Sequence, residues 1–158
     1  LEDIVFCRMH PVFDGTEWRM VRDVMPALAK DLLTTKPIPN EQMFDALRHA
    51  KSECGLSLCH GMPVMQSFYQ MLGRGADIGK YKIKLERSGM TFLAARLSPK
   101  VRPITTAARI SFWHAFGILP HRQIELEREY DGLTPSFARL CERHFSEHFP
   151  QTNLKYHD

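Results

Sequence analysis

The sequence contains few cysteines and no long apolar segment. Of its 158 residues, 4 are Cys, 9 are Gly and 10 are Pro. This content is too low in Cys for a disulfide scaffold and too low in Gly and Pro for a collagen-like repeat. No apolar run approaches the roughly 20 residues of a membrane helix, and the first residues are acidic where a signal peptide is basic. We therefore expect one globular, reduced, cytosolic domain.

The motifs of common catalytic centres are also missing. Gly73 and Gly75 flank Arg74, but no strand precedes them and no third Gly or helix follows in the pattern of a dinucleotide or phosphate loop. The sequence has no Asp-Asp pair and no acidic cluster near an expected strand, which metal-assisted phosphoryl transfer would need. We expect no catalytic residue in this chain.

Cysteine and histidine residues raise the possibility of a zinc site. The candidate ligands are Cys141, His144 and His148, together with Cys54 or with Cys59 and His60. Their spacing is looser than the paired ligands of structural zinc sites, and Cys is commonly a small buried hydrophobe. Structural cysteines are favoured over a metal centre, and a Cys-His nucleophilic pair lacks an activating partner. We therefore expect no metal ligand in this chain.

Positive charge is concentrated in the middle of the chain. The net charge is only +3. Residues 74–109 include nine basic residues and only two acidic ones, whereas acidic residues outnumber basic ones after residue 120. Such segregation suits a polyanionic partner, and the alternative is an ordinary solvated helix face.

The N-terminal residues predict a β-hairpin. A strand-like run over residues 4–12 meets the turn pair Asp14-Gly15, and residues 18–22 then alternate apolar with basic side chains. Because the sequence starts within this run and without Met, we expect it to be a segment of a longer polypeptide. Arginine residues lie among aromatic residues in this hairpin. One interpretation is that the arginines bind phosphate groups, and the alternative is that they only keep the surface soluble.

The rest of the sequence predicts helices. Asp23 is a candidate N-cap for a helix through Leu33, Asn40 for one that ends before Gly55, and Thr105 or Thr106 for residues 107–116. Further helices are expected over residues 64–72, over 120–130 and from residue 134, while residues 80–84 could be strand or helix. The helical spacing of apolar residues predicts these core positions: Met43, Phe44, Leu47, Phe68, Phe112, Trp113 and Phe116.

Two blocks of sequence resemble one enzyme family. Residues 6–15 (FCRMHPVFDG), followed by WRMVRD at 18–23 and AKD at 29–31, are similar to the segment after the Gly-Asp-Asp turn in RNA-directed RNA polymerases of tombusvirus-like positive-strand RNA viruses. Residues 108–120 (ARISFWHAFGILP), with Gln123 and Glu127, resemble the late thumb helices of these enzymes. The resemblance leads us to expect an uncharged polar residue such as Gln at position 8, where this sequence has Arg8.

The resemblance implies a mainly α fold with a short N-terminal β-hairpin, as a fragment of a right-hand polymerase thumb. Residues 1–23 would be the primer-grip hairpin at the end of the palm, and residues 24–158 the helical thumb. The parent enzyme would be a nucleotidyltransferase that uses Mg²⁺ or Mn²⁺, with its metal-binding Asp residues upstream of this chain. This fragment would contribute no catalytic residue of its own.

The resemblance also implies partners. These are the RNA template, the nascent RNA duplex, nucleoside triphosphates bound by the palm, and a second polymerase copy in self-association. Replication would take place in the host cytoplasm, at membranes reached through other parts of the parent protein. The expected RNA- or primer-binding residues are Phe6, Cys7, Arg8, Arg19, Arg22, Lys30, Arg74, Lys80, Lys82, Lys84 and Arg87. The alternatives are a free-standing basic RNA-binding module without catalysis and a zinc-stabilised regulatory domain.

Overall fold

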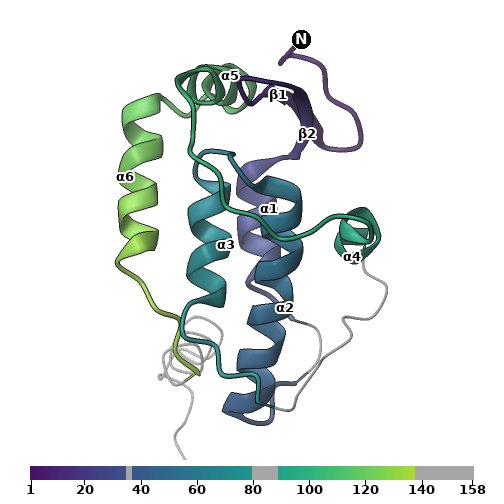
Figure 1. Cartoon of the computed structure of the whole chain (residues 1–158), viewed down its shortest axis with the longest axis vertical. Helices are drawn as coiled ribbons and strands as arrows, with labels where there is room; N and C mark the ends of the chain where they lie inside the picture. The colour runs from purple at the N-terminus through teal and green to yellow at the C-terminus, as the bar shows by residue number, and fades with distance from the viewer. Residues whose placement is uncertain (35–36, 80–88, 138–158) are drawn as a thin grey trace, which may run out of the picture.

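The computed structural model describes residues 1–34, 37–79 and 89–137. In this part of the chain a two-stranded sheet precedes a set of helices (Figure 1). The elements are β1 (Met9–Phe13), β2 (Trp18–Arg22), α1 (Val24–Asp31), α2 (Glu41–Cys59), α3 (Met65–Gly73), α4 (Gly89–Ala94), α5 (Thr106–Phe116) and α6 (Pro120–Asp131). The prediction of a mainly helical fold with an N-terminal β-hairpin is confirmed.

The hairpin pairs β1 with β2 in antiparallel register, from Met9 opposite Arg22 to Phe13 opposite Trp18. The predicted turn is confirmed, because Asp14 Oδ1 accepts hydrogen bonds from the backbone N–H groups of Thr16 and Glu17 and Gly15 takes a positive φ of 105°. The expected start of the first strand near residue 4 is wrong. The ladder begins at Met9, because a tight turn occupies the residues before it.

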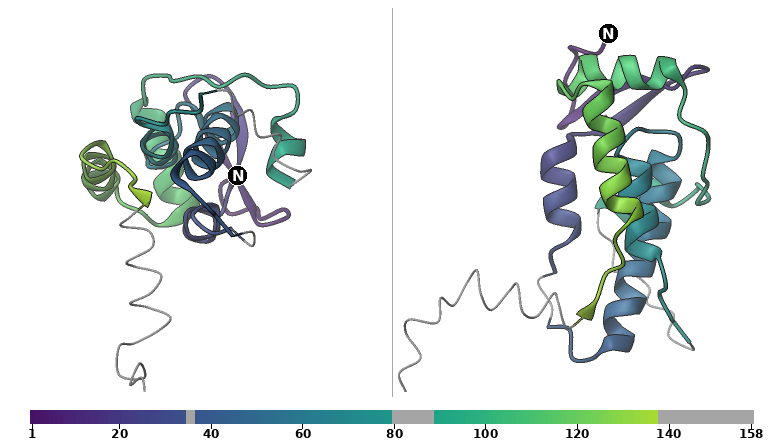
Figure 2. Two further views of the ribbon diagram at one scale, coloured as in Figure 1. Left: turned by 90° about the horizontal axis from the view of Figure 1, so that it is seen from below. Right: turned by 90° about the vertical axis from the view of Figure 1, so that its left-hand side faces the viewer.

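One face of the hairpin packs on the helices. Val12 and Val21 are buried, whereas Trp18 and Met20 on the other face are each 45% exposed. The hydrogen bond from the Phe13 backbone N–H to Ser111 Oγ, at 2.9 Å, ties the edge of β1 to α5. In Figures 1 and 2, α5 and the hairpin together cover one end of the other helices.

Helices α2 and α3 lie side by side and form the centre of the fold (Figures 1 and 2). The helix expected to end before Gly55 runs on to Cys59, so that boundary was wrong. Gly55 is needed within α2, because a Cβ atom there would lie only 2.1 Å from the ring of the buried Tyr69 on α3. Gly55 therefore allows a close contact between two helices. Because glycine is also the residue that most often follows the end of a helix, the sequence alone cannot distinguish these two roles.

The predicted caps of the helices are largely confirmed. Asn40 Oδ1 accepts from the Met43 N–H, and Thr105 Oγ1 accepts from the Ala108 N–H at 3.0 Å. Gly117 ends α5 with a φ of 71°. Asp23 precedes α1 but makes no side-chain cap, and α1 ends at Asp31 instead of Leu33. Residues 80–84, expected to be strand or helix, lie outside the described residues. The helix expected from residue 134 is wrong in its start, because residues 134–136 are not helical, and its continuation beyond residue 137 lies outside the described residues.

The predicted core is correct in part. Phe44, Phe68 and Phe112 are buried, whereas Met43, Leu47 and Phe116 are half-buried. The prediction for Trp113 is wrong, because its side chain is 38% exposed. Successive residues of a helix point about 100° apart, so Phe112 takes the buried face of α5 and Trp113 falls beside it, stacked on His114.

Candidate functional site

A tight turn precedes the first strand and presents residues from the N-terminal block. Phe6 and Met9 exchange two backbone hydrogen bonds, at 2.9 and 2.8 Å, around Cys7 and Arg8. Both central residues have positive φ, 51° and 59°, which is uncommon outside Gly, Asn and Asp. Such conformations cluster at functional sites, where the surrounding structure maintains them. Cys7 and Arg8 are exposed, and so is Phe6 at 68%.

The turn is joined to the start of the first helix. The Asp23 N–H donates to the Arg8 carbonyl at 2.9 Å, immediately before α1. Lys30, on the last turn of α1, is exposed and has no ion pair among the described residues. The strained turn and α1 therefore present exposed side chains that can meet a ligand.

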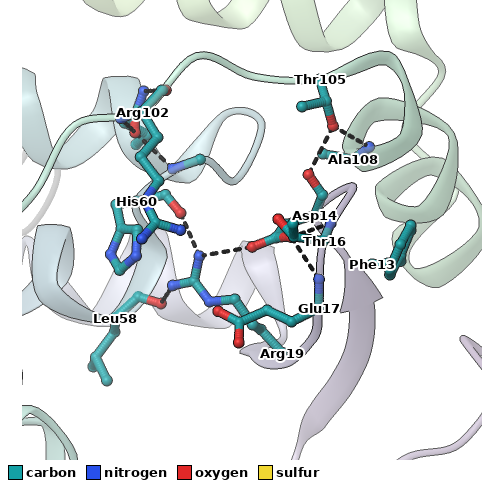
Figure 3. A network of polar contacts seen from close by, with 12 residues as sticks. Phe13, Asp14, Thr16, Glu17, Arg19, Leu58, His60, Arg102, Thr105 and Ala108 are labelled. Carbon is teal, nitrogen blue, oxygen red and sulfur yellow. Dashed lines mark hydrogen bonds and ion pairs between the residues drawn. The ribbon is translucent and has the colours of Figure 1, made fainter.

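Arg19 joins the hairpin to the end of α2. Its guanidinium donates to the Leu58 carbonyl at 2.6 Å and to the His60 carbonyl at 2.5 Å, with Asp14 Oδ2 at 3.7 Å (Figure 3). Carbonyl groups at a helix C-terminus lack intrahelical donors and carry partial negative charge, which a cation neutralises. The contacts of Arg19 therefore anchor β2 to α2.

Arg22 joins the other end of the hairpin to α1 and α3. It donates to Asp31 Oδ2 at 2.7 Å and to the Tyr69 hydroxyl at 2.6 Å, and the Tyr69 hydroxyl donates to the same carboxylate. Burial raises the pKa of Tyr69 and keeps its hydroxyl protonated. Lys51 Nζ donates to the Asp31 carbonyl at 2.7 Å, which fixes the end of α1 against α2.

Arg74 is also occupied within the chain. Its guanidinium donates to the carbonyls of Tyr130, Asp131 and Leu133, at 2.9, 3.0 and 2.5 Å, and so covers the C-terminal end of α6. Arg48 holds the Arg74 carbonyl at 2.6 Å. The structure thus gives three of the predicted RNA-binding arginines, Arg19, Arg22 and Arg74, an anchoring role. Direct contact between these three side chains and RNA stays a prediction.

The predicted site residues therefore fall into three groups. Phe6, Cys7, Arg8 and Lys30 are exposed near the hairpin and α1. Arg19, Arg22 and Arg74 are bound within the chain. The remaining candidates lie outside the described residues, and they are Lys80, Lys82, Lys84 and Arg87.

The structure adds an ion pair between a half-buried and a buried side chain that sequence reasoning missed. Arg109 on α5 donates to both carboxylate oxygens of Glu127 on α6, at 3.0 and 2.9 Å. Glu127 also accepts from the Val64 N–H at 2.9 Å. Val64 is buried with a φ of 64°, a strained conformation for a β-branched residue. Both charged residues lie in the second resembling block, but nothing in their spacing indicated a pair.

Metal binding finds no support in the described residues. No group of three His, Cys, Asp or Glu side chains there is arranged to hold a metal ion. The Cys59 thiol is buried, which raises its pKa to about 11 and disfavours the thiolate that a metal needs. The proposed zinc ligands Cys141, His144 and His148 lie outside the described residues. None of the described helices is long and apolar enough to cross a membrane.

Residues 1–138 match a protein family described as "Viral RNA dependent RNA polymerase". The chain belongs to this family. It is 38% identical to the RNA-directed RNA polymerase of turnip crinkle virus over 148 residues, which is 90% of this chain and 19% of that relative. It is 37% identical to the RNA-directed RNA polymerase of maize chlorotic mottle virus over 139 residues, 87% of this chain and 14% of that relative.

A third relative is the RNA-directed RNA polymerase of Panicum mosaic virus, 39% identical over 136 residues, 84% of this chain and 14% of the relative. The chain thus spans less than a fifth of the length of these polymerases. No solved structure matches it. The prediction of the family from residues 6–31 and 108–127 is confirmed, and the matched region contains the hairpin and all the helices described above.

Proposed function

We propose that this chain is the primer-grip hairpin and thumb portion of a viral RNA-directed RNA polymerase. Residues 1–23 would form the grip and residues 24–158 the thumb. Together they would hold the 3′ end of the nascent strand and the RNA duplex behind it, while other parts of the polymerase add nucleotides. The names of the relatives support the activity, and the geometry of the hairpin supports the role.

The anchoring of the hairpin is the observation that carries this proposal. Arg19 fixes one end of β2 to α2, and Arg22 fixes the other end to α1 and α3. Template-directed addition requires the 3′ hydroxyl to be held accurately in line with the incoming phosphate, because small misplacements cost large factors in rate. A hairpin tied at both ends can provide that accuracy, and its Cys7–Arg8 turn is exposed to meet the RNA.

The proposed mode of RNA contact does not depend on base sequence. Nascent double-stranded RNA is A-form, and side chains cannot read its deep, narrow major groove. Contact with phosphates and 2′ hydroxyl groups suffices for a grip. Arg8 and Lys30 can supply positive charge to phosphates, and Phe6 can pack against a sugar or base.

We further propose that metal ions and nucleotides bind elsewhere in the polymerase. Phosphoryl transfer by polymerases relies on divalent cations that bridge the reacting oxygens. The described residues do not fit such a centre, since they provide no converging carboxylates. The residues of this chain would therefore bind and orient RNA and take no part in bond formation.

The proposal is tested by primer extension with the full-length polymerase. We expect Arg8→Ala and Lys30→Ala to raise the primer–template concentration needed for half-maximal extension by about threefold to tenfold, with an unchanged KM for nucleotides. Arg128→Ala, which removes an exposed charge from α6, serves as the matched control.

Two results would count against the proposal. Unchanged extension by both hairpin-side variants would remove the grip role. The second result is a pair of variants that lose RNA binding but extend primers normally in the full-length polymerase. It would indicate a basic RNA-binding module without a role in positioning.

A further inference from the structure

We infer that residues 95–104, which connect α4 to α5, form a second contact with the phosphate backbone of duplex RNA. We call this segment the basic strap. In Figure 1 it crosses in front of α2 and α3 on its way to α5. It is separate from the Cys7–Arg8 turn, and the inference extends the proposed function by giving the duplex a second attachment.

The charge of the basic strap is unbalanced. No Asp or Glu occurs between residues 87 and 124. Within the strap Arg96, Lys100 and Arg102 are all exposed, and their side chains form no ion pair with the described residues. By contrast, most of the arginines described above are paired or bound to carbonyls. Exposed cations that form no ion pair with the described residues can attract a polyanion, although Glu53 lies near Pro99 and Val101 of the strap.

The backbone of the strap is held at Arg102, although the Arg102 side chain is exposed. Buried Gln66 on α3 accepts from the Arg102 N–H at 3.0 Å and donates to the Arg102 carbonyl at 2.9 Å. The same Gln66 carbonyl oxygen accepts from the Gly61 N–H at 2.6 Å. The Arg102 side chain therefore projects from a defined position, which lowers the conformational entropy lost when a ligand is bound.

The strap also leads directly to the hairpin. Thr105 Oγ1, at its end, donates to the Asp14 carbonyl at 2.8 Å and caps α5 (Figure 3). Figure 3 places Arg102 beside His60, whose carbonyl binds Arg19. Burial, followed by the positive charges of Arg19 and Arg102, holds the pKa of His60 below its usual range. The strap therefore runs from its exposed cations to the turn of the hairpin.

The spacing of the charges fits a phosphate backbone. Lys100 and Arg102 are two residues apart, so their backbones are separated by at most about 7 Å. Both can reach one strand, and neither contact depends on base identity. RNA is favoured over an acidic protein segment because a regular polyanion matches a run of cations with no acidic residue between them.

The inference is tested by salt-dependent binding of a fluorescent RNA duplex to the full-length polymerase. We expect Lys100→Ala and Arg102→Ala each to weaken binding about threefold to tenfold at low salt, and to reduce the slope of log affinity against log salt by about one. Arg102→Lys, which keeps the charge, should retain the slope. Arg128→Ala on α6 should leave both quantities unchanged. Equal melting temperatures would show that all variants are folded.

The possible outcomes separate this inference from the proposed function. Unchanged slopes in the strap variants, with weakened binding by Arg8→Ala, would overturn the inference and leave the grip intact. Unchanged binding in both sets would contradict the inference and the proposed function together. Strap variants that bind RNA normally but lose binding to polyglutamate would show that the strap recognises an acidic protein, which also overturns the inference.

Discussion

Arg22 at the end of β2 and Asp31 at the end of α1 are joined by a hydrogen bond of 2.7 Å between Nη2 and Oδ2. This ion pair folds the first helix back against the hairpin. Tyr69 donates to the same carboxylate from α3, so three elements meet at one side-chain oxygen. This contact, together with the bonds from Arg19 to the end of α2, fixes the orientation of the hairpin relative to the helices.

The hydroxyl of Tyr69 should therefore stabilise the fold. Tyr69→Phe keeps the buried ring and removes the hydroxyl that bonds to Arg22 and Asp31. Hydrogen bonds to charged groups contribute about 1.5–3 kcal/mol, and we expect a loss of that size in the free energy of unfolding by urea. Tyr130→Phe is the matched control, because the Tyr130 hydroxyl has no hydrogen-bond partner within the described ranges. Equal effects of the two variants would contradict the account.

The Arg109–Glu127 pair should be sensitive to the loss of one partner. Glu127→Gln leaves Arg109 half-buried without its counter-charge, and it weakens the acceptor of the Val64 N–H. Removing one member of a buried ion pair typically costs about 3–5 kcal/mol. Glu125→Gln, at the exposed pair with Arg122, should cost less than about 1 kcal/mol. Thermal unfolding measures both, and similar costs would show that the Arg109–Glu127 pair has no special importance.

The contact between α2 and α3 should not tolerate a larger side chain at Gly55. Gly55→Ala places a methyl group 2.1 Å from the Tyr69 ring, so the helices must separate or the ring must move. We expect a cost of about 1–3 kcal/mol in the free energy of unfolding, since overpacking a close-packed interior is destabilising. Gly132→Ala meets only carbonyl oxygens, the nearest at 3.7 Å, and should be nearly neutral. A wild-type melting temperature for Gly55→Ala would refute this packing.

His60 should make stability depend on pH near neutrality. Burial, Arg19 and Arg102 hold its pKa in the folded state below the ordinary value of about 6.5. As pH falls below about 6.5 the unfolded chain binds a proton that the folded chain does not, so the free energy of unfolding decreases. The decrease stops below the folded-state pKa. His60→Gln should reduce the difference in unfolding free energy between pH 7.5 and pH 5.5, whereas exposed His121→Gln should not.

Local sequence signals predicted the elements of this fold well. Each of these signals determines the conformation of residues only a few positions away in the sequence. They are the Asp14-Gly15 turn, the Asn40 and Thr105 caps, and Pro120 at the start of α6. Gly55 and Trp113 were misjudged because their surroundings depend on tertiary packing. Nothing in the spacing of the sequence shows that Tyr69 lies over Gly55, or which face of α5 meets the core.

The candidate site was predictable in its location and less so in the roles of its residues. The resemblance drew attention to the hairpin, and the exposed Phe6, Cys7 and Arg8 agree with a surface that meets a ligand. The partners of Arg19 are backbone carbonyls 39 and 41 residues away, and every residue type provides such carbonyls. An arginine that anchors the fold therefore has the same sequence signature as one that binds phosphate.

Disulfide cross-linking would measure whether the 3′ end of the RNA lies next to the Cys7–Arg8 turn, as a primer grip requires. The full-length polymerase would be bound to a primer–template whose 3′-terminal nucleotide carries a tethered thiol. Cys7 is exposed, whereas Cys54 is half-buried and Cys59 is buried. We expect a cross-link that peptide mapping assigns to Cys7 and that Cys7→Ser abolishes. Efficient extension of the same primer without any cross-link at Cys7 would contradict this position of the 3′ end.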